Sequence, residues 1–107
     1  MKIKERFPLR FIRPTHRDWD RVNLDTVWWD HPHPVCSVTI AELVGVQAYV
    51  TIKGVADADE TSVRPIYVVE IAGVKYIRDG HHRVTRALKR GHKTVIAELL
   101  TLSKRRI

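Results

Sequence analysis

The feature that most constrains the fold is a change of periodicity at Asp79-Gly80, where a strand pattern ends and a helix pattern begins. Residues 64–71 and 74–77 are rich in β-branched and aromatic side chains, and Ala72-Gly73 between them suits a tight turn. We therefore predict a β-hairpin whose second strand delivers the chain to Asp79.

A helix is predicted from about residue 81 to residue 90. Its apolar side chains Val84, Ala87 and Leu88 recur at helical spacing, whereas arginines occupy a different face. Gly91 suits the position after a helix, because glycine adopts the left-handed backbone conformation at little cost.

Polar and ionisable side chains gather at this junction, in the order Asp79-Gly80-His81-His82-Arg83. A helix N-terminus carries N–H groups without partners, glycine permits close approach, and a guanidinium can grip a phosphate with two hydrogen bonds. We therefore predict a phosphate site, and its candidate ligands are Gly80, His82, Arg83 and Arg86. Imidazoles titrate near neutral pH, so the candidates for catalysis are His81, His82 and Asp79.

Each of these residues also has a structural interpretation. Asp79 could cap the helix, and Gly80 could serve only the turn. Arg83 could pair with Asp79 or Glu42, and the histidines could form hydrogen-bonding scaffold. Such a combination of residue types exceeds what a turn requires, which favours the phosphate site.

The string Asp79-Gly80-His81-His82-Arg83, followed by Arg86-Ala87-Leu88, resembles the signature of the ParB/sulfiredoxin superfamily. It is most similar to stand-alone ParB-like nuclease domains, whereas ParB itself has Gly-Glu-Arg-Arg at this place. Sulfiredoxin has a catalytic cysteine in the equivalent loop, and this chain has none there, so sulfiredoxin chemistry is not expected. Arg64-Pro65-Ile66 and Glu42-Leu43, with Gln47, resemble the two earlier stretches of the family. The resemblance spans roughly the last two-thirds of the chain.

The resemblance implies an α+β fold, a ParB/sulfiredoxin-like small mixed sheet flanked by helices. It implies a nuclease that acts on DNA through residues 79–83, with Glu42, Gln47 and Arg64 as accessory residues. Relatives also bind nucleoside triphosphates, so a nucleotide-binding switch or a kinase-like NTPase is the first alternative. A non-catalytic DNA-binding module is the second. Stand-alone copies are familiar from phages and mobile elements.

The implied cofactors are Mg²⁺ or another divalent ion, held by Asp79 or Glu42, and a nucleoside triphosphate. ParB carries a helix-turn-helix domain after this one, and none is expected before Ile107. Any contact with DNA should therefore be directed at the backbone and weaken steeply with salt.

At 107 residues the chain is expected to form one domain over residues 1–107. No apolar run is long enough for a membrane span, and the N-terminus lacks the apolar core of a secretory signal. The single Cys36 cannot form an internal disulfide and is expected to be a small buried side chain. We therefore expect a cytoplasmic protein without a membrane partner.

The net charge of +7 suggests a polyanionic partner, DNA or a nucleotide. The positive charge is concentrated in a basic N-terminal arm, residues 1–21, and a basic tail, residues 103–107. The arm interleaves arginines with aromatic side chains, as in proteins that contact phosphates and stack on bases. Alternatively, Phe7, Leu9 and Phe11 form a short strand that packs on the core, and we favour packing.

The remaining predicted elements are less sharply defined by the sequence. We expect strands at residues 26–29, 35–40 and 94–100, a capping box from Thr39 to Glu42 with a short helix through Val44, a helix that begins at Gln47 and contains Tyr49 and Val50, and a loop over residues 54–62.

Two further stretches carry residues that could hold a metal ion. His31 and His33 lie beside Asp30, but two prolines interrupt them, and a solvated turn is the better interpretation. Asp57, Asp59 and Glu60 could hold Mg²⁺, but their spacing does not match an EF-hand, so we expect a solvated acidic loop.

Overall fold

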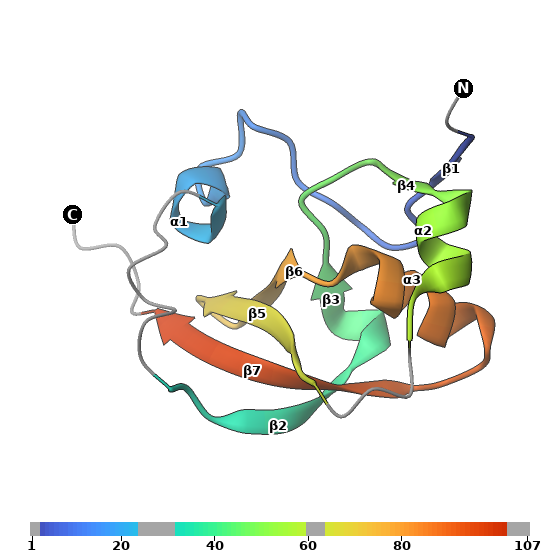
Figure 1. Cartoon of the computed structure of the whole chain (residues 1–107). Helices are drawn as coiled ribbons and strands as arrows, with labels where there is room; N and C mark the ends of the chain where they lie inside the picture. Colours follow the sequence, from blue (N-terminus) through green and yellow to red (C-terminus); the bar gives the residue numbers. More distant parts are fainter. Residues whose placement is uncertain (1–2, 24–31, 60–63, 103–107) are drawn as a thin grey trace.

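The computed structural model describes residues 3–23, 32–59 and 64–102. Its elements, in chain order, are β1 (Lys4–Arg6), α1 (Trp19–Asn23), β2 (Val35–Thr39), the 3-10 helix η2 (Ile40–Glu42), β3 (Leu43–Val44), β4 (Tyr49–Thr51), α2 (Ile52–Asp57), β5 (Ile66–Ile71), β6 (Val74–Asp79), α3 (His81–Lys89) and β7 (Thr94–Leu102). Figure 1 shows their arrangement.

A mixed sheet of five strands, in the order β2-β7-β5-β6-β3, forms the centre of the domain. The hairpin of β5 and β6 is antiparallel, whereas β5 and β7 run parallel, with Ile66 opposite Ala97 and Ile71 opposite Leu102. A separate ribbon pairs β1 with β4. The predicted α+β fold with a small mixed sheet flanked by helices is therefore confirmed.

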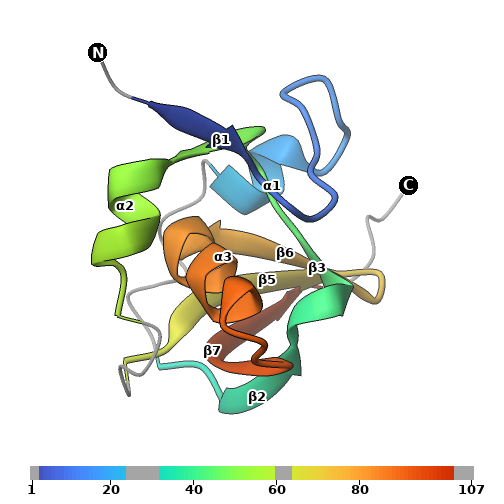
Figure 2. The same ribbon diagram turned by 90° about the vertical axis from the view of Figure 1, so that its right-hand side faces the viewer.

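Two apolar clusters lie on opposite faces of the sheet. Successive side chains of a strand point to opposite faces, and adjacent strand residues belong to different clusters here. Val68 and Ile77 belong to the larger cluster, and their neighbours Val69 and Tyr76 belong to the smaller one. Helix α3 packs into the larger cluster, together with Phe7 and side chains of β4 and α2, and α1 contributes Val22 to the smaller one. Figure 2 shows α3 against the sheet, with α2 and the β1–β4 ribbon beside it.

The hairpin and α3 form as predicted. The turn at Ala72-Gly73 joins β5 to β6, and Val84 and Ala87 of α3 are buried. The helix ends in a Schellman motif, in which the N–H groups of Gly91 and His92 donate to the carbonyls of Leu88 and Ala87, both at 3.0 Å. Gly91 has a φ of +82°, as its predicted position requires.

The N-terminal arm packs on the core, as favoured, but its strand is elsewhere. Phe7 is 2% exposed, and Leu9 and Phe11 pack against the larger cluster. The strand of the arm is β1, because residues Lys4–Arg6 pair with β4. Phe11 makes only an isolated bridge to Gly45.

Three local predictions between Thr39 and Gly54 were wrong. Thr39 makes no side-chain cap bond, and the chain forms the short η2 and then β3 in place of a capped helix. The predicted helix at Gln47 is a loop and β4, because the β-branched residues pair with β1. Helix α2 then occupies the start of the predicted loop, and the Thr51 side chain caps it by accepting from the Gly54 N–H at 3.0 Å.

The strand predicted at residues 26–29, His31, Glu60 and the basic tail lie outside the described residues. Cys36 is half-buried and packs against the larger apolar cluster. None of the described helices is long and apolar enough to cross a membrane.

Candidate functional site

The junction between β6 and α3 depends on Gly80. Its φ of +124° is outside the range that other residues readily adopt, and an added Cβ would lie 2.6 Å from Cγ2 of Ile66. Gly80 is the N-cap of α3 and has no side chain to accept from the first N–H groups of the helix. Within the described part of the chain no side chain caps α3, so its N-terminus keeps free donors and partial positive charge. The alternative in which Asp79 caps the helix is not realised.

A cleft of about 480 Å³ opens at this junction. One wall is the predicted corner, and the other comes from the C-terminal part of α2 and the residues that follow it. The corner at residues 79–83 and the acidic residues Asp57 and Asp59, which are distant in the sequence, therefore share one cleft. Its lining residues are Gln47, Gly54, Asp57, Ala58, Asp59, Asp79, Gly80, His81, His82 and Arg83.

His81 is a buried, neutral side chain. It is 5% exposed, lies edge-on to Phe7 with 5.1 Å between ring centroids, and its Nε2 accepts from the Val46 N–H at 2.9 Å. Burial, and to a smaller extent the neighbouring His82, lower the pKa of His81 to about 4. The Nε2 lone pair is committed to the backbone of another segment, so His81 ties the start of α3 to the β3–β4 connection.

His82 is half-buried and faces α2 across the cleft. Its Nε2 accepts from the Thr51 N–H at 3.3 Å and lies 3.4 Å from Thr51 Oγ1. Gly54 makes room for this ring, because a Cβ there would lie 2.4 Å from Cδ2 of His82. Of the two histidines, His82 is the one with access to both the cleft and solvent.

The two arginines of the predicted site have different surroundings. Arg83 lines the cleft and donates from Nη1 to the Arg64 carbonyl. Arg86 lies one turn later and donates to the carbonyls of Ala56 at 2.9 Å and Val55 at 3.4 Å. Arg86 therefore binds the C-terminal carbonyls of α2, which satisfies groups that a helix end leaves without partners.

The accessory residues also differ in whether they reach the cleft. Gln47 lines the cleft, and its side-chain amide donates to the Tyr49 carbonyl at 2.9 Å. Arg64 reaches the site through its carbonyl oxygen, which Arg83 contacts. Glu42 lies near Lys75, at 3.9 Å, and Lys75 is at the end of β6 remote from Asp79. The structure therefore does not bring Glu42 to the cleft.

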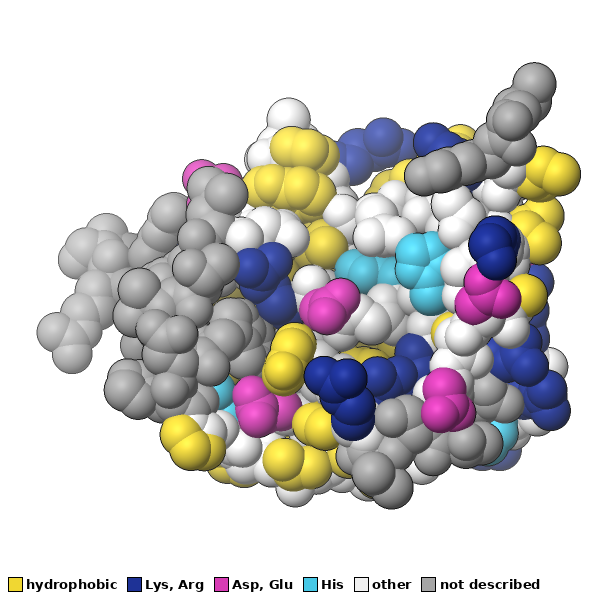
Figure 3. Space-filling view, in the orientation of Figure 1, with side chains coloured by type: hydrophobic (Ala, Val, Ile, Leu, Met, Phe, Trp, Pro, Cys, Tyr) yellow, Lys and Arg dark blue, Asp and Glu magenta, His cyan; other side chains and the backbone are white. Residues whose placement is uncertain are grey.

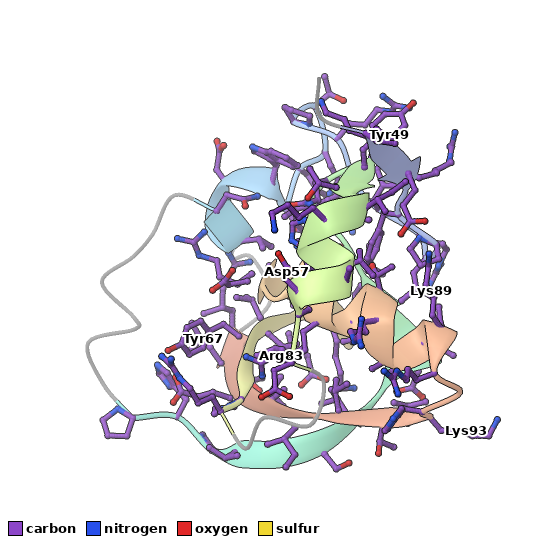
Figure 4. The ribbon with its side chains drawn as sticks, turned by 45° about the vertical axis from the view of Figure 1, so that its right-hand side comes forward. Tyr49, Asp57, Tyr67, Arg83, Lys89 and Lys93 are labelled. Atoms are coloured by element: carbon purple, nitrogen blue, oxygen red, sulfur yellow. The ribbon has the colours of Figure 1, made fainter. Side chains whose placement is uncertain are left out.

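The cleft carries charges of both signs. Asp57 and Asp59 line the wall opposite Arg83 and the α3 N-terminus, and Asp79 lines the same wall as Arg83. Asp57 also pairs with Lys53 at 2.7 Å. Figure 3 shows histidine side chains near the middle of this face with acidic and basic side chains around them, and Figure 4 shows Asp57 and Arg83 on α2 and α3.

No group of three or more potential metal ligands occurs among the described residues. Mg²⁺ commonly binds through one or two carboxylates and completes its shell with substrate phosphates and water. The carboxylates of the cleft fit that mode of binding better than a resident metal centre. Asp57 and Asp59 line the cleft but were expected only in a solvated loop, because spacing alone did not show that α2 faces α3.

The chain matches no protein-family model and no curated protein sequence. Among solved structures it is similar to sulfiredoxin from Arabidopsis thaliana, with a TM-score of 0.48 and 16% sequence identity. The similar region covers 65% of this chain and 88% of the sulfiredoxin chain.

Proposed function

We propose that the cleft between α2 and α3 binds the phosphate groups of a nucleoside triphosphate together with a divalent ion. The observation that carries the proposal is the uncapped N-terminus of α3 above Gly80, which opens into a cleft lined by Arg83. A helix N-terminus offers oriented N–H donors to an anion, and a guanidinium adds a planar fork.

The carboxylates explain why a divalent ion belongs to the proposal. Three aspartates beside a bare polyphosphate would repel it, whereas an ion between carboxylate and phosphate turns that repulsion into attraction. Asp79 is the best placed of them, because it directly precedes Gly80. The ion would neutralise negative charge on the phosphates and orient them toward Arg83.

The size of the cleft favours a nucleotide over duplex DNA. About 480 Å³ is within the usual range for small-molecule sites. Residues of both signs line the cleft, whereas a groove for duplex DNA is expected to be predominantly basic.

Cleavage of DNA is the second candidate, and the net charge of +7 supports it. In such a reaction His82 accepts a proton from water while the water oxygen attacks phosphorus, and the bond from phosphorus to the leaving oxygen breaks. His81 is the weaker base, because its burial lowers its pKa to about 4.

The nucleotide proposal is tested by thermal shift of the full chain with ATP, CTP, GTP and UTP, with and without Mg²⁺. We expect stabilisation by at least one nucleotide with Mg²⁺, and a loss of that stabilisation in Arg83→Ala. Arg90→Ala is the matched control, because it removes an exposed positive charge at the other end of α3. Asp79→Asn should raise the Mg²⁺ concentration that is needed. No shift with any nucleotide would refute the proposal.

The nuclease candidate needs a different assay. Single- and double-stranded DNA are incubated with the protein and Mg²⁺ or Mn²⁺, and the products are separated by electrophoresis. Cleavage that His82→Ala abolishes and His81→Gln retains would support it. Cleavage that both variants retain would point to a contaminating enzyme.

A further inference from the structure

A second charged surface lies on the segment between β1 and α1. Four arginines, Arg6, Arg10, Arg13 and Arg17, fall within twelve residues that contain no acidic residue. All four are exposed. We call these residues and Phe11 the arginine surface. None of them lines the cleft at α3, so the surface is separate from the site proposed above.

Two of the four arginines lie over one ring. The guanidinium carbon of Arg6 lies 5.8 Å from the centroid of Phe11, and that of Arg13 lies 5.4 Å from it. Arg10 and Arg17 both lie close enough to Tyr76 to lower its pKa, against the stronger raising effects of burial and Asp18. Arg6 and Arg13 therefore share one ring, and Arg10 and Arg17 share the surroundings of another.

These charges lack partners of opposite sign within the described part of the chain. Lys53, Lys75 and Lys89 each form an ion pair with a carboxylate there. The four arginines form no ion pair with a described residue. Nearby, Glu5 is occupied by Lys89 at 2.7 Å, and Asp18 accepts from the Tyr76 hydroxyl at 2.9 Å. An external anion would therefore reduce the electrostatic repulsion among the four guanidinium groups.

The backbone that carries the arginines is held to the domain. The N–H of Phe7 donates to the Ala48 carbonyl at 2.8 Å. The N–H of Gly45 donates to the Arg10 carbonyl at 2.7 Å, and the Gly45 carbonyl accepts from the N–H of Ile12 at 2.9 Å. The segment also forms a shallow hollow of about 630 Å³ lined by Arg6, Arg10 and Phe11. The backbone that carries these donors is therefore already ordered before an anion binds, which lowers the entropic cost of binding. Figure 1 shows the segment beside the connection from β3 to β4.

We infer that the arginine surface binds the phosphate backbone of single-stranded nucleic acid. Guanidinium groups match phosphate geometry, and they can also stack on the faces of bases, which a single strand leaves accessible. A membrane is the less suitable partner, because binding in the lipid interface needs exposed apolar side chains. Among the described residues the large exposed ones lie outside residues 6–17, at Ile3, Val35, Tyr49, Ile52, Tyr67, Val74 and Ile96.

The test uses fluorescence anisotropy of a labelled single-stranded oligonucleotide with the full chain, at salt concentrations from about 50 to about 200 mM. Four phosphate contacts predict that log K falls against log salt with a slope of about −3. Arg10→Gln with Arg13→Gln should reduce the slope by about 1.4 and the affinity by about tenfold or more at 100 mM salt.

The matched control is Arg90→Gln with Lys93→Gln, which removes the same charge from exposed positions in the connection between α3 and β7. Figures 1 and 2 both place that connection away from residues 10–17, the segment of Arg10 and Arg13. Equal losses in the two double variants would overturn the inference, since net charge alone would then explain binding. Binding to anionic phospholipid vesicles without binding to the oligonucleotide would also overturn the inference. Arg83→Ala should retain oligonucleotide binding, which separates this inference from the nucleotide proposal.

Discussion

The buried His81 should make the stability of this protein depend on pH. The pKa of His81 is about 4 in the folded chain, whereas a histidine in the unfolded chain has the ordinary pKa of 6.5. Between these values the unfolded chain binds more protons than the folded chain, so the free energy of unfolding falls as the pH is lowered. Protonation would also place an N–H against the Val46 N–H, which now donates to Nε2 at 2.9 Å.

The size of the effect follows from the two pKa values. For one group with these values, the linkage relation gives a loss of about 2 kcal/mol between pH 7 and pH 5, and about 3 kcal/mol by pH 4. A domain of this size is stable by about 5 to 15 kcal/mol, so the loss is a substantial fraction of the total. In urea it corresponds to a fall of about 1 to 2 M in the denaturation midpoint.

The assay is urea denaturation of wild type and His81→Gln at a series of pH values. Glutamine can still accept a hydrogen bond but does not titrate, so the difference between the two pH profiles isolates His81 from other ionisable groups. We expect the wild type to lose about 2 kcal/mol more than the variant between pH 7 and pH 5. Parallel profiles would refute the reasoning. If the variant does not fold, an NMR titration of wild type decides, because the His81 ring signals should not shift above about pH 5.

Three further substitutions, measured by urea denaturation, test contacts of α2 and α3 and the end of α3. Gly54→Ala should cost about 1 to 3 kcal/mol, because the new methyl would lie 2.4 Å from Cδ2 of His82; a neutral result would mean that the ring can move away. Arg86→Met should cost about 1 to 3 kcal/mol, because the Ala56 carbonyl loses its donor at 2.9 Å; an unchanged midpoint would show that water replaces it. Gly91→Ala should cost about 1 kcal/mol through its φ of +82° alone, since no atom lies within 4 Å, and a larger loss would contradict that.

The second half of the chain was largely predictable because its signals are local. The turn at Ala72-Gly73, the helical spacing of Val84 and Ala87 and the glycine at position 91 each act within a few residues. The observed α3 begins at His81, as predicted, and β7 extends two residues beyond the predicted strand. Short-range steric and hydrogen-bonding preferences were sufficient there.

The region from Gly45 to Gly54 was misread because its structure depends on remote partners. Tyr49–Thr51 becomes a strand only because Lys4–Arg6 pairs with it, some 45 residues earlier. Thr51 caps α2 and lies against His82, a contact that spans 31 residues. No pattern within the segment itself records these partners.

The sequence by itself determined where the strand meets the helix, which ionisable residues gather there, and that the chain is strongly basic. These follow from residue order and composition, which are local properties. Only the tertiary structure decided that His81 is buried and accepts from Val46, that Arg86 is directed to the carbonyls of α2, and that Asp57 and Asp59 face Arg83 across one cleft. Burial and long-range pairing arise when segments distant in sequence pack together, and those contacts set the protonation state and the free bonding capacity of each side chain.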